Sequence, residues 1–328
     1  MSGRDTITVG EAAELAGNYL DALGAYQAAL ADPDPLVVAD AHFHLGRVNW
    51  RQGRYDDAIR EYESARLLAM RKEATELRAR VENGLGVVHH ARGEYAQARA
   101  SYAVALEITA DEIQRGRILL NLGAVSNIEG DFGGARSYYT KSRAIFERTG
   151  FVRGEASALH NLGMLNADEG RLVEADESYR RCLELLESLG DRPGIATVLL
   201  NRSELSCARG DFDDAIANCD LALSIYADVG DDVGRGEAQR WKGHALFRQK
   251  RFADAERVLA DALKIARRSQ VRLLEAESSW DMGLSRAAHG DGAGAKESLQ
   301  RAHELFEQLG ARRELAKVAA ALAALQTE

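Results

Sequence analysis

The chain has few cysteines and no long run of apolar residues. Its three cysteines, Cys182, Cys207 and Cys219, are far apart and in no C-x-x-C pair, so neither a disulfide framework nor a zinc site is indicated. We expect them to be reduced and buried. No stretch reaches the roughly 18 consecutive apolar residues of a membrane span, and the start, MSGRDTITVG, lacks the segments of a secretory leader. These absences favour a soluble cytoplasmic protein, and the abundance of Ala and Arg favours a bacterial source.

Basic residues are also in deficit. The 42 Lys and Arg are outnumbered by 51 Asp and Glu, which gives a net charge of −9. Because contacts with phosphates need a clustered basic surplus, the composition argues against a general binder of nucleic acids or membrane surfaces. We therefore expect no nucleic-acid partner and no membrane partner.

Catalytic signatures are missing from the sequence. It contains no G-x-x-x-x-G-K-[ST], no H-E-x-x-H and no G-x-S-x-G, and the G-L-G segment at 84–86 lacks the third glycine of a dinucleotide fingerprint. The pairs His42 and His44, and His89 and His90, point in different directions on a helix, which disfavours a metal site. We predict no enzyme activity, no metal and no cofactor.

The chain has instead a fixed period. Glycines that close a helical turn recur at steps of 40, 37, 40, 40, 40 and 40 residues, with a lysine in one place: Gly53, Gly93, Gly130, Gly170, Gly210, Lys250 and Gly290. A period of this size is typical of a solenoid of stacked helical hairpins. The sequence therefore predicts one elongated array rather than two or three globular domains.

Two further columns of small residues indicate that each period is a pair of antiparallel helices. One lies seven residues before the turn: Gly46, Gly86, Gly123, Gly163, Ser203, Gly243 and Gly283. The other follows the turn: Ala58, Ala98, Ala135, Ala175, Ala215, Ala255 and Ala295. Small residues on both helices let two backbones approach closely, and an aromatic residue at the start of most second helices is expected to fill the wedge between hairpins.

These residues resemble the tetratricopeptide repeat (TPR) family. Its pattern L-G-x(6)-G-x-[YF]-x-x-A is closely matched by the segments that begin at Leu45, Leu85, Leu122 and Leu162, and the period is similar to that of the long-repeat subgroup. The resemblance implies an all-α, right-handed superhelix of about eight hairpins that binds peptides or helices. We place the array at 1–310, with hairpins near 3–31, 38–68, 78–108, 115–146, 155–186, 195–226, 235–266 and 275–306, and a capping helix at 311–328.

Both ends depart from the pattern. Residues 6–9, Thr-Ile-Thr-Val, are poor helix formers, so the first helix is expected to be short or frayed. Gly292 replaces the wedge aromatic, which predicts that the eighth hairpin is the least stable. The last segment carries Leu315, Val318, Leu322 and Leu325 on one face, as a cap over an exposed apolar surface requires. A partner-binding amphipathic helix is the alternative.

The resemblance also implies binding residues on the inner face of the first helix of each hairpin. This lining falls six, three and two residues before the helix glycine and one, four and five after it. In the first part of the chain and its middle, the predicted peptide-binding residues are Arg80, Asn83, Arg117, Asn121, Asn127, His160, Asn161 and Asn201. An amide both donates and accepts, so Asn121, Asn161 and Asn201 are expected to hold the main chain of a ligand, unless Asn is simply common at this position of the fold.

The C-terminal half adds cations interleaved with aromatic residues. The predicted binding residues here are Arg240, Trp241, His244, Arg248 and Trp280. Arg240, His244 and Arg248 are spaced i, i+4 and i+8, so we expect them to form a stripe on one face of the helix that suits an acidic peptide. The alternative is that these side chains are merely solvated. The clamp by which some TPR proteins hold a chaperone's carboxylate is not indicated, because its slots hold Leu120, Ala124, Thr197 and Asn201.

We therefore predict a non-enzymatic protein-interaction scaffold that docks a protein or peptide along the concave face. The alternative is a regulatory sensor, in which a signalling peptide or small molecule changes the pitch of the superhelix. An enzyme built on a helical toroid would need a deep, closed pocket with converging carboxylates. Self-association through the terminal hairpins stays open for any of these functions.

Overall fold

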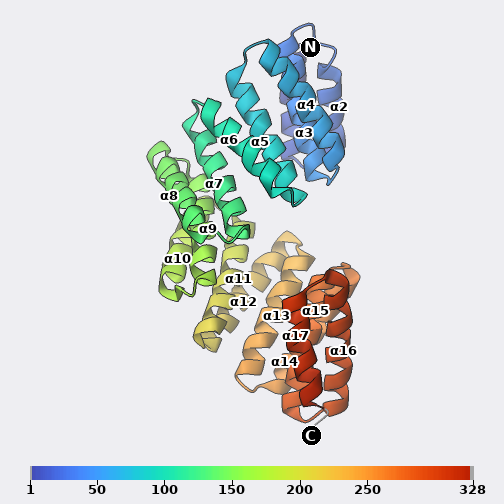
Figure 1. The fold of residues 1–328 in the computed structure, drawn as a ribbon. Coiled ribbons are helices and arrows are strands. Elements are labelled where there is room, and N and C mark those ends of the chain that lie inside the picture. The colour runs from blue at the N-terminus through green and yellow to red at the C-terminus, as the bar shows by residue number, and fades with distance from the viewer. Residues whose placement is uncertain (1, 326–328) are drawn as a thin grey trace. The chain divides into compact units, whose positions relative to one another are not determined.

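The computed structural model describes residues 2–325, which form seventeen α-helices and no β-strand (Figure 1). The helices are α1 (Gly3–Leu15), α2 (Tyr19–Ala29), α3 (Pro35–Arg51), α4 (Tyr55–Arg71), α5 (Thr75–Ala91), α6 (Tyr95–Ile108), α7 (Glu112–Ile128), α8 (Phe132–Thr149), α9 (Val152–Asp168), α10 (Leu172–Ser188), α11 (Arg192–Arg209), α12 (Phe212–Val229), α13 (Asp232–Arg248), α14 (Phe252–Arg268), α15 (Arg272–His289), α16 (Gly292–Leu309) and α17 (Arg312–Ala324). The predicted all-α helical-repeat class is confirmed.

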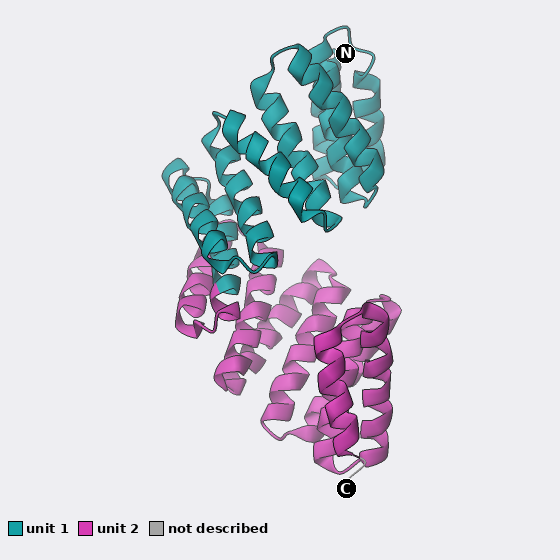
Figure 2. Ribbon diagram, in the orientation of Figure 1, with its two compact units in different colours: residues 1–165 teal, residues 166–328 magenta. Residues whose placement is uncertain are grey.

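The chain divides into two compact units, residues 1–165 and 166–328, with the boundary inside α9 (Figure 2). In unit 1, helices α1, α3, α5 and α7 each pack against the helix that follows. In unit 2, the same pairing joins α11 to α12, α13 to α14 and α15 to α16, and α17 packs on α16. Odd-numbered helices also contact one another within each unit, so each unit has a first-helix face and a second-helix face.

The turns inside the hairpins depend on a left-handed backbone conformation. Gly53 and Gly93 have φ angles of 72° and 74°, and Lys250, which replaces glycine in this column, adopts 63°. A residue with a Cβ atom loses about 1 kcal/mol or more in this conformation. The repeated feature is therefore the backbone geometry, and glycine is the residue that adopts it at least cost.

The glycine column of the first helices makes room for a large side chain of the second helix. A Cβ atom added at Gly86 would lie 2.4 Å from the ring of Tyr102, and one added at Gly243 would lie 2.5 Å from Leu259. The alanines of the second helices are fully buried, as expected. The atoms closest to the glycines, however, belong to the larger side chains of the second helices, such as Tyr102 and Leu259. At Ser203 the hydroxyl donates to the carbonyl of Ala215 over 3.0 Å, which binds the two helices directly.

Gly86→Ala is expected to lower the free energy of unfolding of unit 1 by about 1–3 kcal/mol, because the ring of Tyr102 is fully enclosed and cannot move away. Gly24→Ala is the matched control. Gly24 is exposed within α2 with no atom near its missing Cβ, so alanine there should stabilise by about 0.5–1 kcal/mol. Urea denaturation measures the free energy of unfolding of both variants. Equal values for the two would contradict the tight contact between Gly86 and Tyr102.

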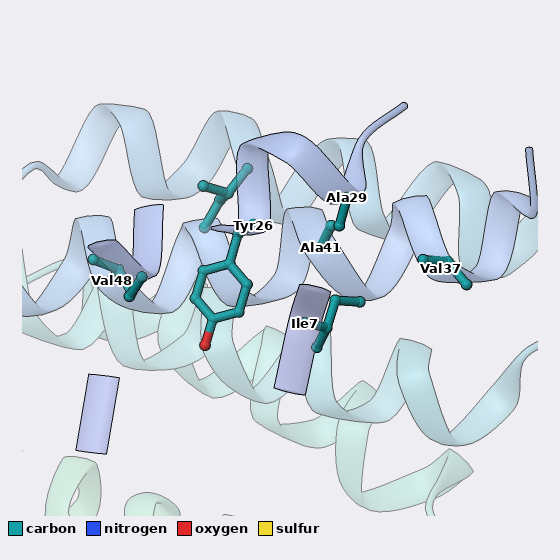
Figure 3. Close-up of a cluster of buried hydrophobic side chains, with 8 residues drawn as sticks. Ile7, Tyr26, Ala29, Val37, Ala41 and Val48 are labelled. Atoms are coloured by element: carbon teal, nitrogen blue, oxygen red, sulfur yellow. The ribbon is translucent and has the colours of Figure 1, made fainter. Parts of the chain in front are cut away.

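The N-terminal helix is short, as expected, but it is not frayed. Helix α1 has 13 residues, against 17 for α3, and Ser2 and Asp5 form a capping box at its start. Its residue Ile7 packs into a buried cluster with Tyr26, Ala29, Val37, Ala41 and Val48 (Figure 3). The β-branched residues 6–9 lower the intrinsic helix propensity of this segment. The N-terminal cap and the burial of Ile7 compensate for this loss.

The predicted apolar face of the last helix is confirmed. Val318 is 1% exposed and packs with Leu315, Leu322 and Leu325 against the core formed by Leu299, Leu305 and Phe306. This packing supports the capping role. Residues 326–328, the end of the predicted capping segment, lie outside the described residues.

The three cysteines are buried and in no disulfide bond, as predicted. Burial raises the pKa of the Cys207 thiol to about 12 and that of Cys219 to about 11, so both stay protonated at neutral pH. Among the described residues, no helix is both long and apolar enough to cross a bilayer.

Candidate functional site

A pocket of about 420 Å³ lies on the first-helix face of unit 2. Its walls come from α11, α13 and α15 and from the residue before α15: Leu200, Asn201, Glu204, Glu237, Arg240, Trp241, Val271, Leu273, Leu274 and Glu277. Helix α13 contacts both α11 and α15, which brings the three helices together. Because Glu237 and Glu277 are one 40-residue period apart, they occupy the same register and face the same surface.

Arg240 lies at the centre of this pocket. Its Nε lies 3.3 Å from a carboxylate oxygen of Glu277, and its Nη1 lies 3.4 Å from Oδ2 of Asp281. The guanidinium also lies 4.2 Å from the ring centroid of Trp241, at cation–π distance. With only 13% of its side chain exposed, Arg240 is held in place from three sides.

Three glutamates of the pocket, one each from α11, α13 and α15, interact electrostatically with this arginine. Burial among the pocket walls raises the pKa of Glu204, Glu237 and Glu277 above the ordinary value, and the positive charge of Arg240 partly opposes each shift. The negative charge of Glu277 further raises the pKa of both Glu204 and Glu237. One guanidinium therefore faces more negative charge than it neutralises, and the pocket favours a cationic group.

The pocket is open to solvent at two of these carboxylates. Glu204 and Glu237 are exposed, although the walls displace part of the water around them, which accounts for their raised pKa. Converging carboxylates are the feature that an enzyme on this fold would need. An open pocket does not exclude water from them, however, so the geometry suits binding of a cation better than acid–base catalysis.

The C-terminal cations predicted to form a stripe have partners within the protein. Arg240 is paired as described above, and Nδ1 of His244 lies 2.9 Å from the same buried carboxylate, that of Asp281. Arg248 lies instead over the ring of Phe212, 5.1 Å from its centroid. Since a carboxylate of α15 already pairs with both Arg240 and His244, an acidic peptide gains little there.

The two predicted tryptophans differ in their surroundings. Trp241 is half-buried, packs beside Cys207, Ala215 and Ala245, and lines the pocket. Trp280 is half-buried against the C-terminal core and does not line the pocket. Of this pair, only Trp241 is placed for a role in the pocket.

The predicted residues of unit 1 have local partners. Arg80 lies over the ring of Phe43, 4.2 Å from its centroid, and donates to Asp40 over 3.2 Å. It lines a second pocket, of about 430 Å³, between α1, α3 and α5. Arg117 is exposed and lies 5.0 Å from the ring centroid of Phe151. Both arginines thus cover aromatic rings of a neighbouring helix or turn.

The predicted asparagines differ in their hydrogen-bond partners and in the unit to which they belong. Asn121 donates its amide to the side-chain oxygen of Asn83 over 3.0 Å, so one of its donors is already used inside the protein. Asn127 has a buried amide oxygen with no hydrogen-bond partner. Asn161 and Asn201 are half-buried and lie in different units, so the ligand-holding ladder stays a prediction. His160 is half-buried, and burial lowers its pKa.

The histidine pairs weighed as metal ligands have other partners. His42 lies 2.6 Å from Glu61, and His89 lies 2.6 Å from Glu94. His44 is 1% exposed and stacks on Tyr26. Among residues 2–325, no group of three or more His, Cys, Asp or Glu side chains is arranged to hold a metal ion.

The glutamates of the pocket were not among the predicted binding residues. Glu237 and Glu277 lie six residues before Gly243 and Gly283, and Glu204 lies one residue after Ser203, all at positions of the expected inner lining. The register alone could have found them.

The comparisons with known proteins agree on the fold. The model of the tetratricopeptide repeat matches residues 37–111, 114–188 and 194–268. The apo form of RapI aligns over 99% of this chain and 97% of its own at 13% identity, with a TM-score of 0.70. A Rap protein complexed with Competence and Sporulation Factor aligns over 99% and 97% at 14% identity, with a TM-score of 0.65.

Aspartyl phosphate phosphatase F from Bacillus subtilis aligns over 99% of this chain and 93% of its own at 11% identity, with a TM-score of 0.61. At these identities the likeness shows the fold alone. No curated protein sequence matches this chain. The family model, in contrast, covers well over half of the residues, and its repeats coincide with the glycine and alanine columns. The chain therefore belongs to the tetratricopeptide repeat family, whose arrays are typically non-catalytic modules of protein interaction.

Proposed function

We propose that this protein binds a peptide segment of a partner on the first-helix face, and that the pocket of unit 2 takes a cationic side chain of that peptide. The observation that carries the proposal is the convergence of Glu204, Glu237 and Glu277 on a single arginine in an open pocket. The proposal keeps the predicted scaffold function. It reverses the predicted charge of the ligand at this position.

Two of the three carboxylates are available for a ligand. Glu277 faces Arg240 at 3.3 Å, whereas Glu204 and Glu237 form no ion pair among the described residues. A lysine or arginine head group between them would supply the missing positive charge. Hydrogen bonds to charged groups contribute roughly 1.5–3 kcal/mol each, because the carboxylates are partly removed from water.

The remaining walls suit the stem and main chain of the same residue. Leu200, Leu273 and Leu274 provide apolar surface for the methylene groups of a lysine or arginine. Asn201 lines the same pocket, next to Leu200. We propose that its amide bonds to the ligand's main chain, which is the role predicted for it from the sequence.

A regulatory sensor is the second candidate. The solved Rap protein that aligns over 99% of this chain is a complex with Competence and Sporulation Factor, and its alignment extends over both units. A sensor would couple peptide binding to a change of shape. Small-angle scattering with and without the bound peptide distinguishes the two candidates, since a rigid scaffold predicts superimposable curves.

Neutralising Glu204 and Glu237 is expected to weaken binding of a basic peptide by roughly 10- to 100-fold. Short acetylated peptides with Lys, Gln or Glu between leucines serve as probes in fluorescence anisotropy, and the wild type should bind the Lys peptide best. The variant is Glu204→Gln with Glu237→Gln. Its control is Glu174→Gln with Glu177→Gln, two exposed glutamates of α10, which should bind as the wild type does. Preference for the Glu peptide, or equal losses in both variants, would refute the proposal.

The affinity for the Lys peptide is also expected to fall as the pH is lowered. The pKa of each of the three glutamates is raised by burial, so they take up protons at a higher pH than an ordinary glutamate, whose pKa is about 4.3. Protonation removes the negative charge that holds the cation. Affinity measured across the acidic range should therefore rise with pH and level off once the carboxylates are ionised. A pH-independent affinity would contradict the ionic mode of binding.

A further inference from the structure

A groove runs along the second-helix face of unit 2, between α14 and α16, with α15 as its floor. It consists of two cavities, of about 730 and 750 Å³, which share Arg267 of α14 and Arg301 of α16 and are therefore contiguous. Its floor extends from Arg272 to Arg286 of α15. Those residues are separated by about 21 Å at the helical rise of 1.5 Å per residue. The groove is thus long enough for about four turns of a helix.

The groove is basic in an otherwise acidic protein. Its lining holds five cationic side chains, Lys264, Arg267, Arg272, Arg286 and Arg301, and three carboxylates, Glu275, Glu297 and Glu304. The whole chain has a net charge of −9, so this excess is local. An acidic ligand would find here a local positive potential.

The cations of the groove outnumber their internal partners. The Nε atoms of Arg267 and Arg301 both lie 3.1 Å from the same oxygen of Glu275. Arg301 also lies 3.4 Å from Glu304, and Arg286 lies 4.0 Å from Glu256. Lys264 and Arg272 form no ion pair among residues 2–325. Part of the positive charge is therefore free to meet a ligand from outside.

The cations are not a requirement of the repeat. Forty residues earlier, in the equivalent positions of α12, α13 and α14, the five residues are Ser224, Ala227, Asp232, Leu246 and Asp261. The helices there have the same pairing and none of these five positive charges. Because the helices of the preceding repeat pair without them, these five cations are not needed for the helix pairing.

We propose that this groove docks an acidic, amphipathic segment of a partner protein. Cations on both walls would pair with its carboxylates, and Ala260 and Leu263 would contact its apolar side chains. A positive charge spread along about 21 Å of groove fits an extended row of carboxylates better than one compact anion. The groove uses α14, α15 and α16, whereas the pocket for the basic side chain includes α11 and α13, so the two sites have different ligands.

The test uses the full chain and a fluorescein-labelled helical peptide with Glu on one face and Leu on the other. We expect saturable binding that weakens as salt is raised, and at least a tenfold loss of affinity in the double variant Lys264→Glu with Arg272→Glu. The neutral variant Lys264→Gln with Arg272→Gln should give a smaller loss. Arg180→Glu with Arg257→Glu is the charge-matched control on exposed residues outside the groove, and it should bind nearly as well as the wild type.

Three results would overturn the proposal. Equal losses in the groove variant and the control would mean that only the net charge of the protein matters. Equal binding of a peptide with Gln in place of Glu would exclude charge recognition, and displacement of the peptide by millimolar inorganic phosphate would indicate a small-anion site. The Glu204→Gln and Glu237→Gln changes should leave this binding unaltered, so failure of one site does not imply failure of the other.

Discussion

Replacing Glu14 by Ala is expected to lower the free energy of unfolding of unit 1 by about 3 kcal/mol. The side chain of Glu14 is 5% exposed, and one of its oxygens accepts from Arg47 over 2.7 Å and from the hydroxyl of Tyr26 over 3.0 Å. Its other oxygen lies 3.4 Å from Arg51. Removing the carboxylate leaves a largely enclosed guanidinium and a buried hydroxyl without their partner, and that desolvation penalty dominates the loss.

The control is an ion pair of similar composition on the surface. Glu63 and Arg66 are both more than a third exposed, so Glu63→Ala should cost no more than about 1 kcal/mol. Urea denaturation followed by circular dichroism measures both variants. Arg47→Met in the Glu14→Ala background should recover part of the lost stability, because it removes the stranded charge. If Glu14→Ala and Glu63→Ala are equally stable, burial does not determine the strength of this contact.

The stability of unit 1 is expected to fall as the pH is lowered below about 6.5, by about 1.4 kcal/mol per pH unit from His44 alone. Burial, and then the positive charges of Arg47 and Arg80, lower the pKa of this imidazole to about 3. Between pH 3 and 6.5 the unfolded chain therefore binds a proton that the folded chain does not. Stability rises with pH in that window and is independent of His44 above it.

The carboxylates near His44 do not reverse this shift. Oxygens of Glu11 and Asp40 lie 3.6 Å from its Nε2, beyond hydrogen-bond distance, and Asp40 is also paired with Arg80. The measurement is the difference in unfolding free energy between the wild type and His44→Phe as a function of pH. That difference should change with the stated slope between pH 3 and 6.5. Parallel pH profiles of the wild type and His44→Phe would contradict a neutral buried imidazole.

Most of the fold could be predicted because the repeat imposes local requirements on residue type. A left-handed turn favours glycine, and a close contact such as that of Gly86 with Tyr102 tolerates no Cβ atom. These requirements return once per hairpin, so they appear as columns in one sequence. Lys250, at φ 63°, shows that the geometry persists even where the residue type changes.

The candidate site was predicted only in part, because its charges depend on partners from other hairpins. Arg240 and His244 were predicted as binding residues, and the carboxylate that pairs with both, that of Asp281, lies 41 and 37 residues away. Periodicity indicates which face a side chain occupies. It does not indicate whether a cation meets solvent or a carboxylate of the next helix.

By itself, the sequence determined the class of the protein and the register of each hairpin, because turn geometry and close helix packing act over a few residues. Only the tertiary structure decided the sign of the charge at each surface. On the first-helix face it surrounds Arg240 with glutamates, and on the second-helix face it leaves two arginines to share Glu275. Electrostatic interactions extend through space rather than along the chain, so the ligand preference of each surface follows from which helices lie side by side.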